Sequence, residues 1–300
     1  MKTALLTGAS GFLGKIIYSH LRTSMVIKTA GRHPKSDFKW DLSSGEFDLK
    51  GEFDLVIHSA GKAHSSPSTE EERDDFFRIN VTGTTNLLKS LQRLDRLPQS
   101  FVFISTIAVY GLDKGSEVDE SHQLNATDPY GSSKIKAERL IQNWCTKHNI
   151  QYTILRLPLI AGPNPPGNLG AMISAIKKGY YLNISGGMAR KSVVLADDVA
   201  SIVLKAAKYG GVYNLTDGCH PSFIELSELI AKQLKKNNPN NIPNWLAKLM
   251  AKAGDIVGSQ APINSDKLKK ITSDLTFDDT KARNVLGWNP TPVLERFRVS

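Results

Sequence analysis

Residues 3–14 read TALLTGASGFLG, an apolar run followed by three glycines at a spacing of three. The run Thr3–Thr7 predicts a buried strand, and residues 13–21 have the periodicity of a helix. Gly8, Gly11 and Gly14 permit a tight turn and a close approach of the backbone to a pyrophosphate. The first amides of the following helix would face the same anion. Because the glycines stand between a strand and a helix, this stretch predicts a dinucleotide-binding unit.

The first half of the chain continues to alternate short apolar runs with helical patterns. We expect strands at residues 25–29, 55–59, 101–105 and 152–157, and helices at residues 76–94 and 132–148. Strands separated by helices are typical of right-handed crossovers in a parallel sheet. The prediction is therefore an α/β fold built on a Rossmann doubly wound parallel sheet.

A segment rich in proline and glycine, residues 162–167, interrupts this alternation after Pro158. Proline removes a hydrogen-bond donor, so we expect irregular structure there. Beyond it we expect strands at 193–195 and 212–215, helices at 197–207, 223–235 and 245–253, and then a lysine-rich loop. We therefore predict a dinucleotide-binding Rossmann domain, residues 1–160 and 190–216, and a smaller mixed α/β substrate-binding domain, residues 161–189 and 217–300.

The composition excludes several classes of protein. The 300 residues are 40% hydrophobic and 22% charged, which is typical of a globular chain. Apolar runs fall short of the roughly 18 residues that span a bilayer. Cys145 and Cys219 fit neither a metal site nor a disulfide framework, so we expect a cytoplasmic protein without a metal. The formal net charge is +9, but no nucleic-acid motif accompanies it, so we expect no nucleic-acid partner.

The residue after the second strand indicates the cofactor. An acidic residue there binds the ribose hydroxyls of NAD, whereas an arginine accommodates the 2′-phosphate of NADP. Here Arg32 follows the strand, and the first carboxylate is Asp37. The sequence therefore favours NADP(H), with NAD(H) as the alternative.

Tyr130 and Lys134 predict a proton-transfer pair, because residues four apart share one face of a helix. A phenol with a pKa near 10 is a poor catalyst at neutral pH, and a neighbouring ammonium favours the phenolate. Thr106 follows a predicted strand at the edge of the sheet where such folds bind ligands. Its hydroxyl could hold a sugar oxygen, or it could make a local turn hydrogen bond.

Together these segments resemble the extended short-chain dehydrogenases/reductases of the nucleotide-sugar epimerase/dehydratase type. The matching segments are TGASGFLG at 7–14, VIHSAG at 56–61, NVTGTTNLL at 80–88, ISTIAVYG at 104–111, YGSSK at 130–134, LRLPLIAGP at 155–163 and FDDTKARNVLGWNP at 277–290. They run almost end to end and stand in the order of the family.

The resemblance implies roles for individual residues. Tyr130 would be the catalytic acid/base, Lys134 would bind the nicotinamide ribose, and Thr106 would contact the hexose 4-oxygen. The residues that would hold the cofactor are Gly8, Ser10, Gly11, Phe12, Leu13, Gly14, Arg32, Asp41, Leu42, Ser59, Ala60, Gly61, Lys62, Asn80, Ser105, Tyr130, Lys134 and Pro158. Substrate would meet Thr106, Asn168 and either Arg190 or Lys191, a choice that the sequence leaves open. The family's usual homodimer is also expected.

Departures from the family narrow the expected reaction. Sugar-nucleotide 4,6-dehydratases carry an acidic pair directly after the threonine, where this chain has Ile107 and Ala108. Apolar side chains cannot move protons, which disfavours 4,6-dehydration. The first hypothesis is a reductase of a 4-keto nucleotide sugar, most simply a UDP-sugar. The alternatives are a UDP-sugar 4-epimerase and a non-catalytic NADP-binding sensor or assembly factor.

Two further features have competing interpretations. Residues 245–252, WLAKLMAK, are amphipathic and basic. Such a stripe could touch a membrane surface, but we favour a helix that faces the core, and so no membrane contact. His58 lies in a predicted buried strand and is expected to have a hydrogen-bonded structural role, whereas His64 could meet substrate.

Overall fold

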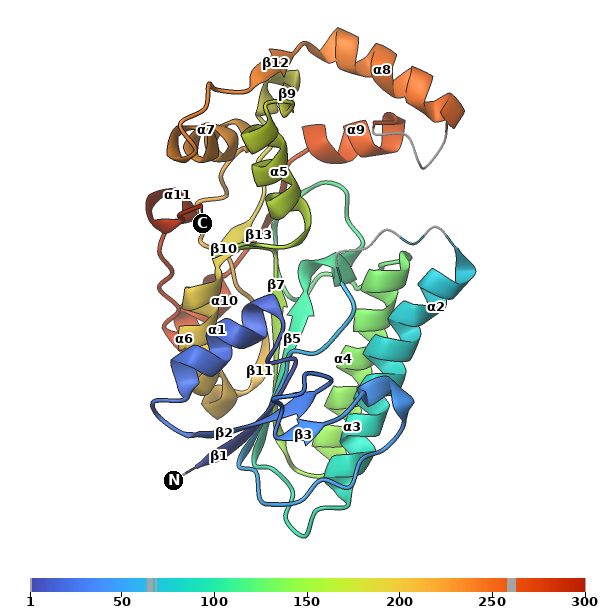
Figure 1. Cartoon of the computed structure of the whole chain (residues 1–300), viewed down its shortest axis with the longest axis vertical. Coiled ribbons are helices and arrows are strands. Elements are labelled where there is room, and N and C mark those ends of the chain that lie inside the picture. The colour runs from blue at the N-terminus through green and yellow to red at the C-terminus, as the bar shows by residue number, and fades with distance from the viewer. Residues whose placement is uncertain (1, 64–66, 68, 258–262, 300) are drawn as a thin grey trace.

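The centre of the protein is a seven-stranded parallel sheet with the order β11-β7-β5-β4-β1-β2-β3 (Figure 1). This computed structural model describes residues 2–63, 67, 69–257 and 263–299. The strands are β1 (Thr3–Thr7), β2 (Val26–Gly31), β3 (Phe38–Lys39), β4 (Leu55–His58), β5 (Ser100–Thr106), β7 (Gln151–Leu157) and β11 (Gly211–Asn214). Every neighbouring pair is parallel, so the predicted α/β doubly wound fold is confirmed.

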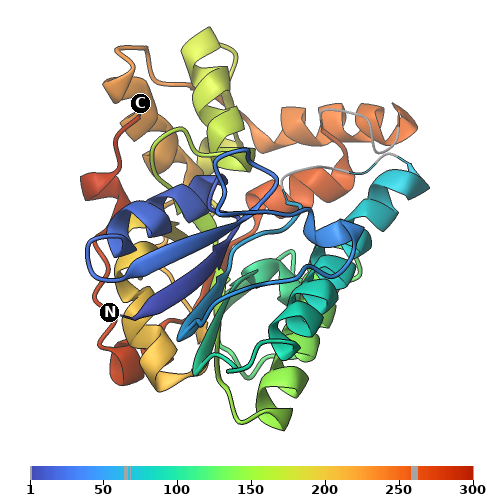
Figure 2. The same ribbon diagram turned by 60° about the horizontal axis from the view of Figure 1, so that its bottom comes forward.

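Helices cover both faces of this sheet, as the turned view in Figure 2 shows. One layer holds α1 (Phe12–Leu21), α6 (Ala196–Tyr209) and α10 (Thr280–Leu286). The other holds α2 (Glu70–Phe77), α3 (Gly83–Gln92) and α4 (Pro129–Lys147). Leu5 and Leu6 are both fully buried but belong to cores on opposite faces. This burial on both sides explains why the strands read as continuous apolar runs.

A smaller mixed lobe lies beyond the carboxyl ends of the strands (Figure 1). Its helices are α5 (Gly167–Lys178), α7 (Phe223–Gln233), α8 (Asn244–Val257), α9 (Ser265–Thr272) and α11 (Val293–Arg296). Three short parallel pairs accompany them: β8 (Leu159–Ala161) with β10 (Val193–Leu195), β9 (Leu182–Ile184) with β12 (Asn240–Ile242), and β6 (Gly115–Val118) with β13 (Leu275–Phe277).

Some expected elements have different bounds. The helix expected at 76–94 starts at Glu70, where the Thr69 side chain caps it, and a π-helical turn at Arg78–Thr82 separates α2 from α3. The helix expected at 132–148 starts at Pro129, so Tyr130 lies in its first turn. The predicted lysine-rich loop is wrong, because residues 265–272 form α9 with Asn264 as its N-cap.

The prediction that residues 245–252 face the core is also wrong for their largest side chains. Ala247 and Ala251 are buried, whereas Trp245 is 65% exposed and Leu249 57% exposed. The small residues pack on the lobe and the large ones point outward. In the described part of the chain, no helix is long and apolar enough to cross a membrane.

Candidate active site

The carboxyl ends of four neighbouring strands bring the predicted site residues to one edge of the sheet. In the β1–β4 register Thr7 pairs with His58, and in the β5–β7 register Thr106 pairs with Leu157. The strands therefore end at the same level. The order of the sheet reverses at β1, between β4 and β2. Open α/β sheets bind ligands in the crevice at such a point.

The turn after β1 has no space for a side chain at Gly8 or Gly14. A Cβ on Gly8 would lie 2.6 Å from the backbone nitrogen of Ala60, and one on Gly14 would lie 2.0 Å from the Gly8 carbonyl oxygen. Gly8 also has a φ of +74°, which favours glycine. The Gly11 amide donates to the Gly8 carbonyl over 2.9 Å and closes the turn. Because the N-cap of α1 is glycine, its first amides are left for an anion.

The neighbours of these glycines divide between surface and core. Ser10 is exposed, whereas the side chain of Leu13 is buried in the core beneath α1. Only the backbone of Leu13 could therefore meet a cofactor. Phe12 packs on Gly162, where a Cβ would lie 3.0 Å from the tip of its ring. Pro158 directly follows β7 and is buried.

Arg32 stands exposed directly after β2. The carboxylate that could compete with it, Asp37, accepts hydrogen bonds from the Thr29 amide (2.9 Å) and hydroxyl (2.8 Å). Lys28 pairs with the same carboxylate. Asp37 thus stabilises the connection between β2 and β3, and Arg32 has no competition from this carboxylate at the end of β2.

Asp41 lies close enough to Arg32 for their charges to interact, and Leu42 follows it. The Asp41 side chain caps the 3₁₀ helix Leu42–Ser44 by accepting from the Ser43 amide. Hydrogen bonds from Ser43 lower the pKa of Asp41, and the charge of Arg32 lowers it further. The Asn86 amide donates to the Leu42 carbonyl oxygen over 2.7 Å and fixes this turn.

Asn80 holds the loop after β4, which contains Ser59, Ala60, Gly61 and Lys62. Its Oδ1 accepts from the Lys62 amide (2.7 Å), and its Nδ2 donates to the Lys62 carbonyl (3.1 Å) and the Ser133 hydroxyl (2.9 Å). The Lys62 ammonium turns away to Asp75 at 2.9 Å. Asn80 therefore acts on this loop as a positioning residue.

His58 links β1 to α3 beneath the site. Its ring nitrogens lie 2.7 Å from the Thr7 hydroxyl and 3.0 Å from the Thr84 hydroxyl. Burial lowers the pKa of His58 to about 3, with a contribution from Lys134, so the ring is neutral. The predicted structural role of His58 is confirmed. His64 lies outside the described residues.

Tyr130 and Thr106 meet where α4 begins above β5. Burial raises the pKa of Tyr130, and a hydrogen bond with the Thr106 side chain opposes that rise. The Thr106 hydroxyl also accepts from the Ala108 amide over 3.2 Å. The local turn hydrogen bond of Thr106 is thus confirmed, and the same hydroxyl also reaches the phenol of Tyr130.

Lys134 lies one turn after Tyr130 and points against β5. Its ammonium donates to the Ile104 carbonyl over 2.7 Å and lies 3.8 Å from the centre of the Phe103 ring. Burial lowers the pKa of Lys134 to about 7, and Glu138 acts in the opposite direction. Burial therefore makes this ammonium a stronger acid than that of an exposed lysine.

A buried ion pair that the sequence analysis missed lies beneath the catalytic residues. Glu138 of α4 pairs with Arg156 of β7 at 2.8 Å, and both side chains are at most 5% exposed. The Ser105 hydroxyl donates to Glu138, and Arg156 donates to the Tyr110 hydroxyl over 3.0 Å. Glu138 follows Tyr130 by eight and Lys134 by four residues, so its place on the same helix face was the available signal.

The predicted substrate contacts lie in the smaller lobe. Asn168 is exposed in the first turn of α5. The Lys191 ammonium is engaged by the carbonyls of Lys270 and Ser273, at 3.0 and 2.9 Å. Arg190 is half exposed and donates to the His220 carbonyl over 3.1 Å. These two neighbouring cations therefore point in different directions.

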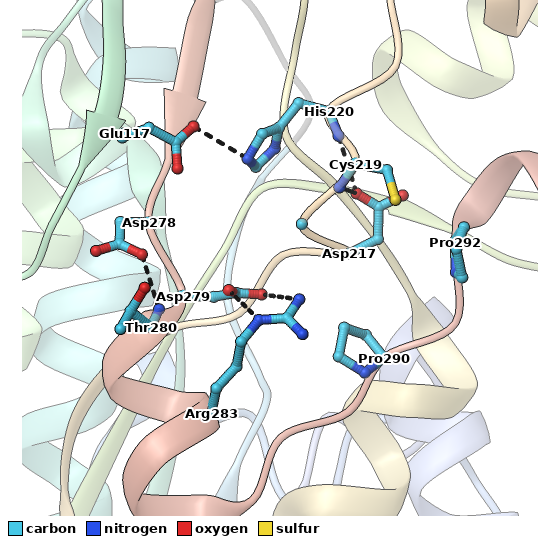
Figure 3. Close-up of a pocket in the computed structure, with 11 residues that line it drawn as sticks. Glu117, Asp217, Cys219, His220, Asp278, Asp279, Thr280, Arg283, Pro290 and Pro292 are labelled. Carbon is cyan, nitrogen blue, oxygen red and sulfur yellow. Dashed lines mark hydrogen bonds and ion pairs between the residues drawn. The ribbon is translucent and has the colours of Figure 1, made fainter.

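A separate polar cavity of about 420 Å³ lies between β6, α10 and the loop after β11 (Figure 3). Its carboxylates are engaged: Asp217 accepts from the amides of Cys219 and His220, and Asp279 pairs with Arg283. The predicted site residues lie elsewhere, so this cavity is a junction between segments. Among the described residues, no group of His, Cys, Asp and Glu side chains is arranged to hold a metal ion.

Comparisons with known proteins agree on the family. The model of the NAD dependent epimerase/dehydratase family matches residues 4–216. The UDP-glucose 4-epimerase of Vibrio cholerae is 27% identical over 98% of this chain and 92% of its own length. The N-acetyl-α-D-glucosaminyl-diphospho-ditrans,octacis-undecaprenol 4-epimerase of Escherichia coli O157:H7 is 27% identical over 93% of this chain and 88% of its own. The UDP-glucose 4-epimerase structure from Thermotoga maritima, 19% identical, superposes with a TM-score of 0.76 over 98% of this chain and 96% of its own.

Proposed function

The chain belongs to the NAD dependent epimerase/dehydratase family, and on this premise we propose that it reduces the C4 keto group of a nucleotide-linked sugar with NADPH. It is an enzyme of the nucleotide-sugar epimerase/dehydratase type with a nicotinamide cofactor.

The residues present fit a dinucleotide. The turn at Gly8 and Gly14, which any Cβ would fill, would hold the pyrophosphate. Asp41 and Leu42 would flank the adenine, and Ser105 and Pro158 would lie toward the nicotinamide. When bound, the cofactor would supply the hydride for the sugar carbon.

Tyr130 is proposed as the proton donor to the sugar oxygen. Burial raises the pKa of its phenol, so the group is protonated at neutral pH, as a general acid must be. Thr106, which bonds to this phenol, would steady the same oxygen. Lys134 would bind the ribose after leaving the Ile104 carbonyl. Its positive charge near the phenol of Tyr130 would then favour release of the phenolic proton.

The observation that carries the reductase proposal is Arg32 at the end of β2. Asp37 is turned to Thr29 and Lys28, and the Asp41 side chain caps the turn at Ser43, so Arg32 is the side chain proposed to meet the 2′-phosphate. An arginine pairs well with a 2′-phosphate. Preference for NADPH suits net reduction.

The second candidate is a UDP-sugar 4-epimerase, which the names of the two curated relatives favour. It would use the same Tyr130 and Thr106, with the cofactor retained between turnovers. A 4,6-dehydration is disfavoured, because Ile107 and Ala108 follow Thr106 and cannot move protons.

Cofactor binding separates the two candidates. We expect nucleotide-free protein to bind NADPH at least about tenfold more tightly than NADH, which corresponds to about 1.4 kcal/mol. Arg32→Ala should abolish most of this preference. Arg22→Ala, an exposed arginine at the far end of α1, should keep it. Protein that retains NAD after purification and binds both cofactors equally would contradict the reductase and favour the epimerase.

Activity tests the proposed catalytic residue. Tyr130→Phe should lose at least about a hundredfold in turnover of 4-keto UDP-sugars and in 4-epimerisation, the usual loss for a positioned acid. Tyr209→Phe, at the exposed end of α6, is the matched control and should retain full activity. A fully active Tyr130→Phe enzyme would contradict both candidates.

The diphosphate contact is proposed to be Arg190, because its side chain is about half exposed beside Glu225, whereas two carbonyls hold the Lys191 ammonium. Its guanidinium can grip a diphosphate with two parallel hydrogen bonds. Arg190→Gln should therefore raise the KM for the nucleotide sugar and change kcat little. A normal KM in this variant would contradict the assignment.

A further inference from the structure

Helix α8 presents two different apolar faces. Ala247 and Ala251, at 0% and 1% exposure, pack on Ile184, Ile242 and Leu268 of the smaller lobe. Trp245, Leu249 and Ile256 form a second stripe at helical spacing and are 65%, 57% and 90% exposed. A helix needs one such face to pack on its own protein. The second, exposed apolar face therefore indicates an interaction outside this chain's own core.

The outward stripe is continuous and wide. Leu246 and Met250 extend it along one side, at 36% and 40% exposure. The five side chains together present an indole, a thioether and three branched chains to the surface of a 14-residue helix. Figure 1 shows α8 as the outer edge of the smaller lobe, beyond α9.

Basic charge flanks this stripe. Lys248 and Lys252 lie on the other edge of α8, one turn apart, next to Trp245 and Ile256 on the helix surface. Five lysines and two aspartates lie between residues 244 and 272, a net charge of +3. One of the aspartates, Asp255, is turned to the amide and hydroxyl of Ser265 at the start of α9. Within α8 the two lysines outnumber this aspartate, and α9 adds three lysines and one aspartate to the same lobe.

We propose that α8 docks this protein onto an anionic phospholipid surface, with Trp245, Leu249 and Ile256 in the acyl boundary and Lys248 and Lys252 at the headgroups. This arrangement, an apolar face with a basic edge, is how amphipathic helices lie in the plane of a bilayer. The helix is about 21 Å long at 1.5 Å per residue, too short to cross the hydrocarbon core and long enough to lie on it. The charge beside the stripe favours lipid over an apolar protein surface.

The docking helix is connected to the candidate site. Lys270 of α9 pairs with Asp113 at 3.2 Å, in the loop that follows Thr106 and the 3₁₀ turn Ile107–Tyr110. Helix α9 packs on α8 through Leu268 and Ile271. Docking would therefore hold the smaller lobe of the proposed enzyme against the membrane surface.

Vesicle binding with tryptophan fluorescence tests the proposal. Trp40 and Trp288 are 4% exposed and Trp144 is partly buried, so a response to vesicles belongs mainly to Trp245. With phosphatidylglycerol/phosphatidylcholine vesicles we expect a blue shift, protection from acrylamide and quenching by brominated acyl chains. Trp245→Phe should still sediment with the vesicles and lose the spectral change.

The variant W245S/L249S/I256S should lose at least about tenfold in vesicle affinity and keep its enzymatic activity. K248Q/K252Q should bind more weakly to anionic vesicles, with a smaller dependence on salt. Tyr209→Ser, an exposed aromatic residue on α6, should bind as the parent does.

Two outcomes would overturn the proposal. The first is parent protein that stays in the supernatant with anionic vesicles at low salt. The second is a concentration-dependent dimer, seen by analytical ultracentrifugation, that W245S/L249S/I256S abolishes, because the stripe would then bind a second copy. Neither outcome bears on the proposed reduction, which is measured with water-soluble nucleotide sugars.

Discussion

At the scale of single residues, burial shifts the pKa values of three groups in the site. Burial lowers the pKa of Lys134 to about 7 and that of His58 to about 3, whereas it raises the pKa of Tyr130. In each case burial disfavours the charged form. The sequence could place Tyr130 and Lys134 on one helix face, because that follows from spacing. It could not give the depth at which they lie, which depends on α4 being packed over β5.

His58 makes the stability of the fold depend on pH. Its pKa of about 3 in the folded chain lies below the ordinary histidine value of 6.5. Between these values the unfolded chain binds the extra proton, so the free energy of unfolding falls as pH drops, by up to about 1.4 kcal/mol per pH unit from this group. His58→Gln does not titrate there, although it lacks the imidazole's fit between Thr7 and Thr84.

We therefore expect the parent and His58→Gln to differ most in unfolding free energy at neutral pH and to converge as pH falls from 6.5 toward 4. Urea denaturation at several pH values measures this difference. A constant difference over that range would mean that His58 is already charged in the folded protein.

At the scale of elements, the ion pair between Glu138 and Arg156 connects α4 to the centre of the sheet. Both side chains are nearly inaccessible, so removing one partner leaves a buried charge. Arg156→Met should lower the free energy of unfolding by about 3–5 kcal/mol. E138L/R156M should cost clearly less than the sum of the two single variants, because it leaves no unpaired charge.

A double-mutant cycle in guanidinium chloride measures the coupling between the two side chains, and cofactor affinity reports whether α4 has moved. Lys50→Met, an exposed lysine whose partner Asp48 is also exposed, is a control and should change stability by less than about 0.5 kcal/mol. If the effects of Glu138 and Arg156 simply add, the two groups act independently.

The elements also show where sequence periodicity succeeds and where it fails. The central strands were predictable because burial on both faces makes them continuous apolar runs. Helix α9 was not, because Lys267, Lys269 and Lys270 dominate its short sequence and the capping by Asn264 becomes visible only in the structure. For α8 the helical period was predicted correctly, but the face that packs on the protein was not. Alternating large and small apolar residues share one helix, and only its neighbours decide that Ala247 and Ala251 pack inward.

At the scale of the whole molecule, the last 25 described residues return from the smaller lobe to the sheet. Strand β13 pairs with β6, and Asn214 of β11 donates to the Asp278 carbonyl over 3.3 Å. Trp288 then lies in the core beneath α1 and α6, 4% exposed, and its indole donates to the Thr216 carbonyl over 2.9 Å. The C-terminal segment thus ties the two parts of the fold together.

This connection predicts that the same substitution at two tryptophans changes the free energy of unfolding by very different amounts. Trp288→Ala should lower the free energy of unfolding by about 3–5 kcal/mol, because it opens a cavity in the core. Trp245→Ala, on the exposed stripe of α8, should change it by less than about 0.5 kcal/mol. Because residues 275–299 contact both the sheet and the smaller lobe, Trp288→Ala should lower the midpoint of a single transition seen by circular dichroism and by calorimetry. Two separate transitions, with only one of them displaced, would show instead that the sheet and the smaller lobe unfold independently.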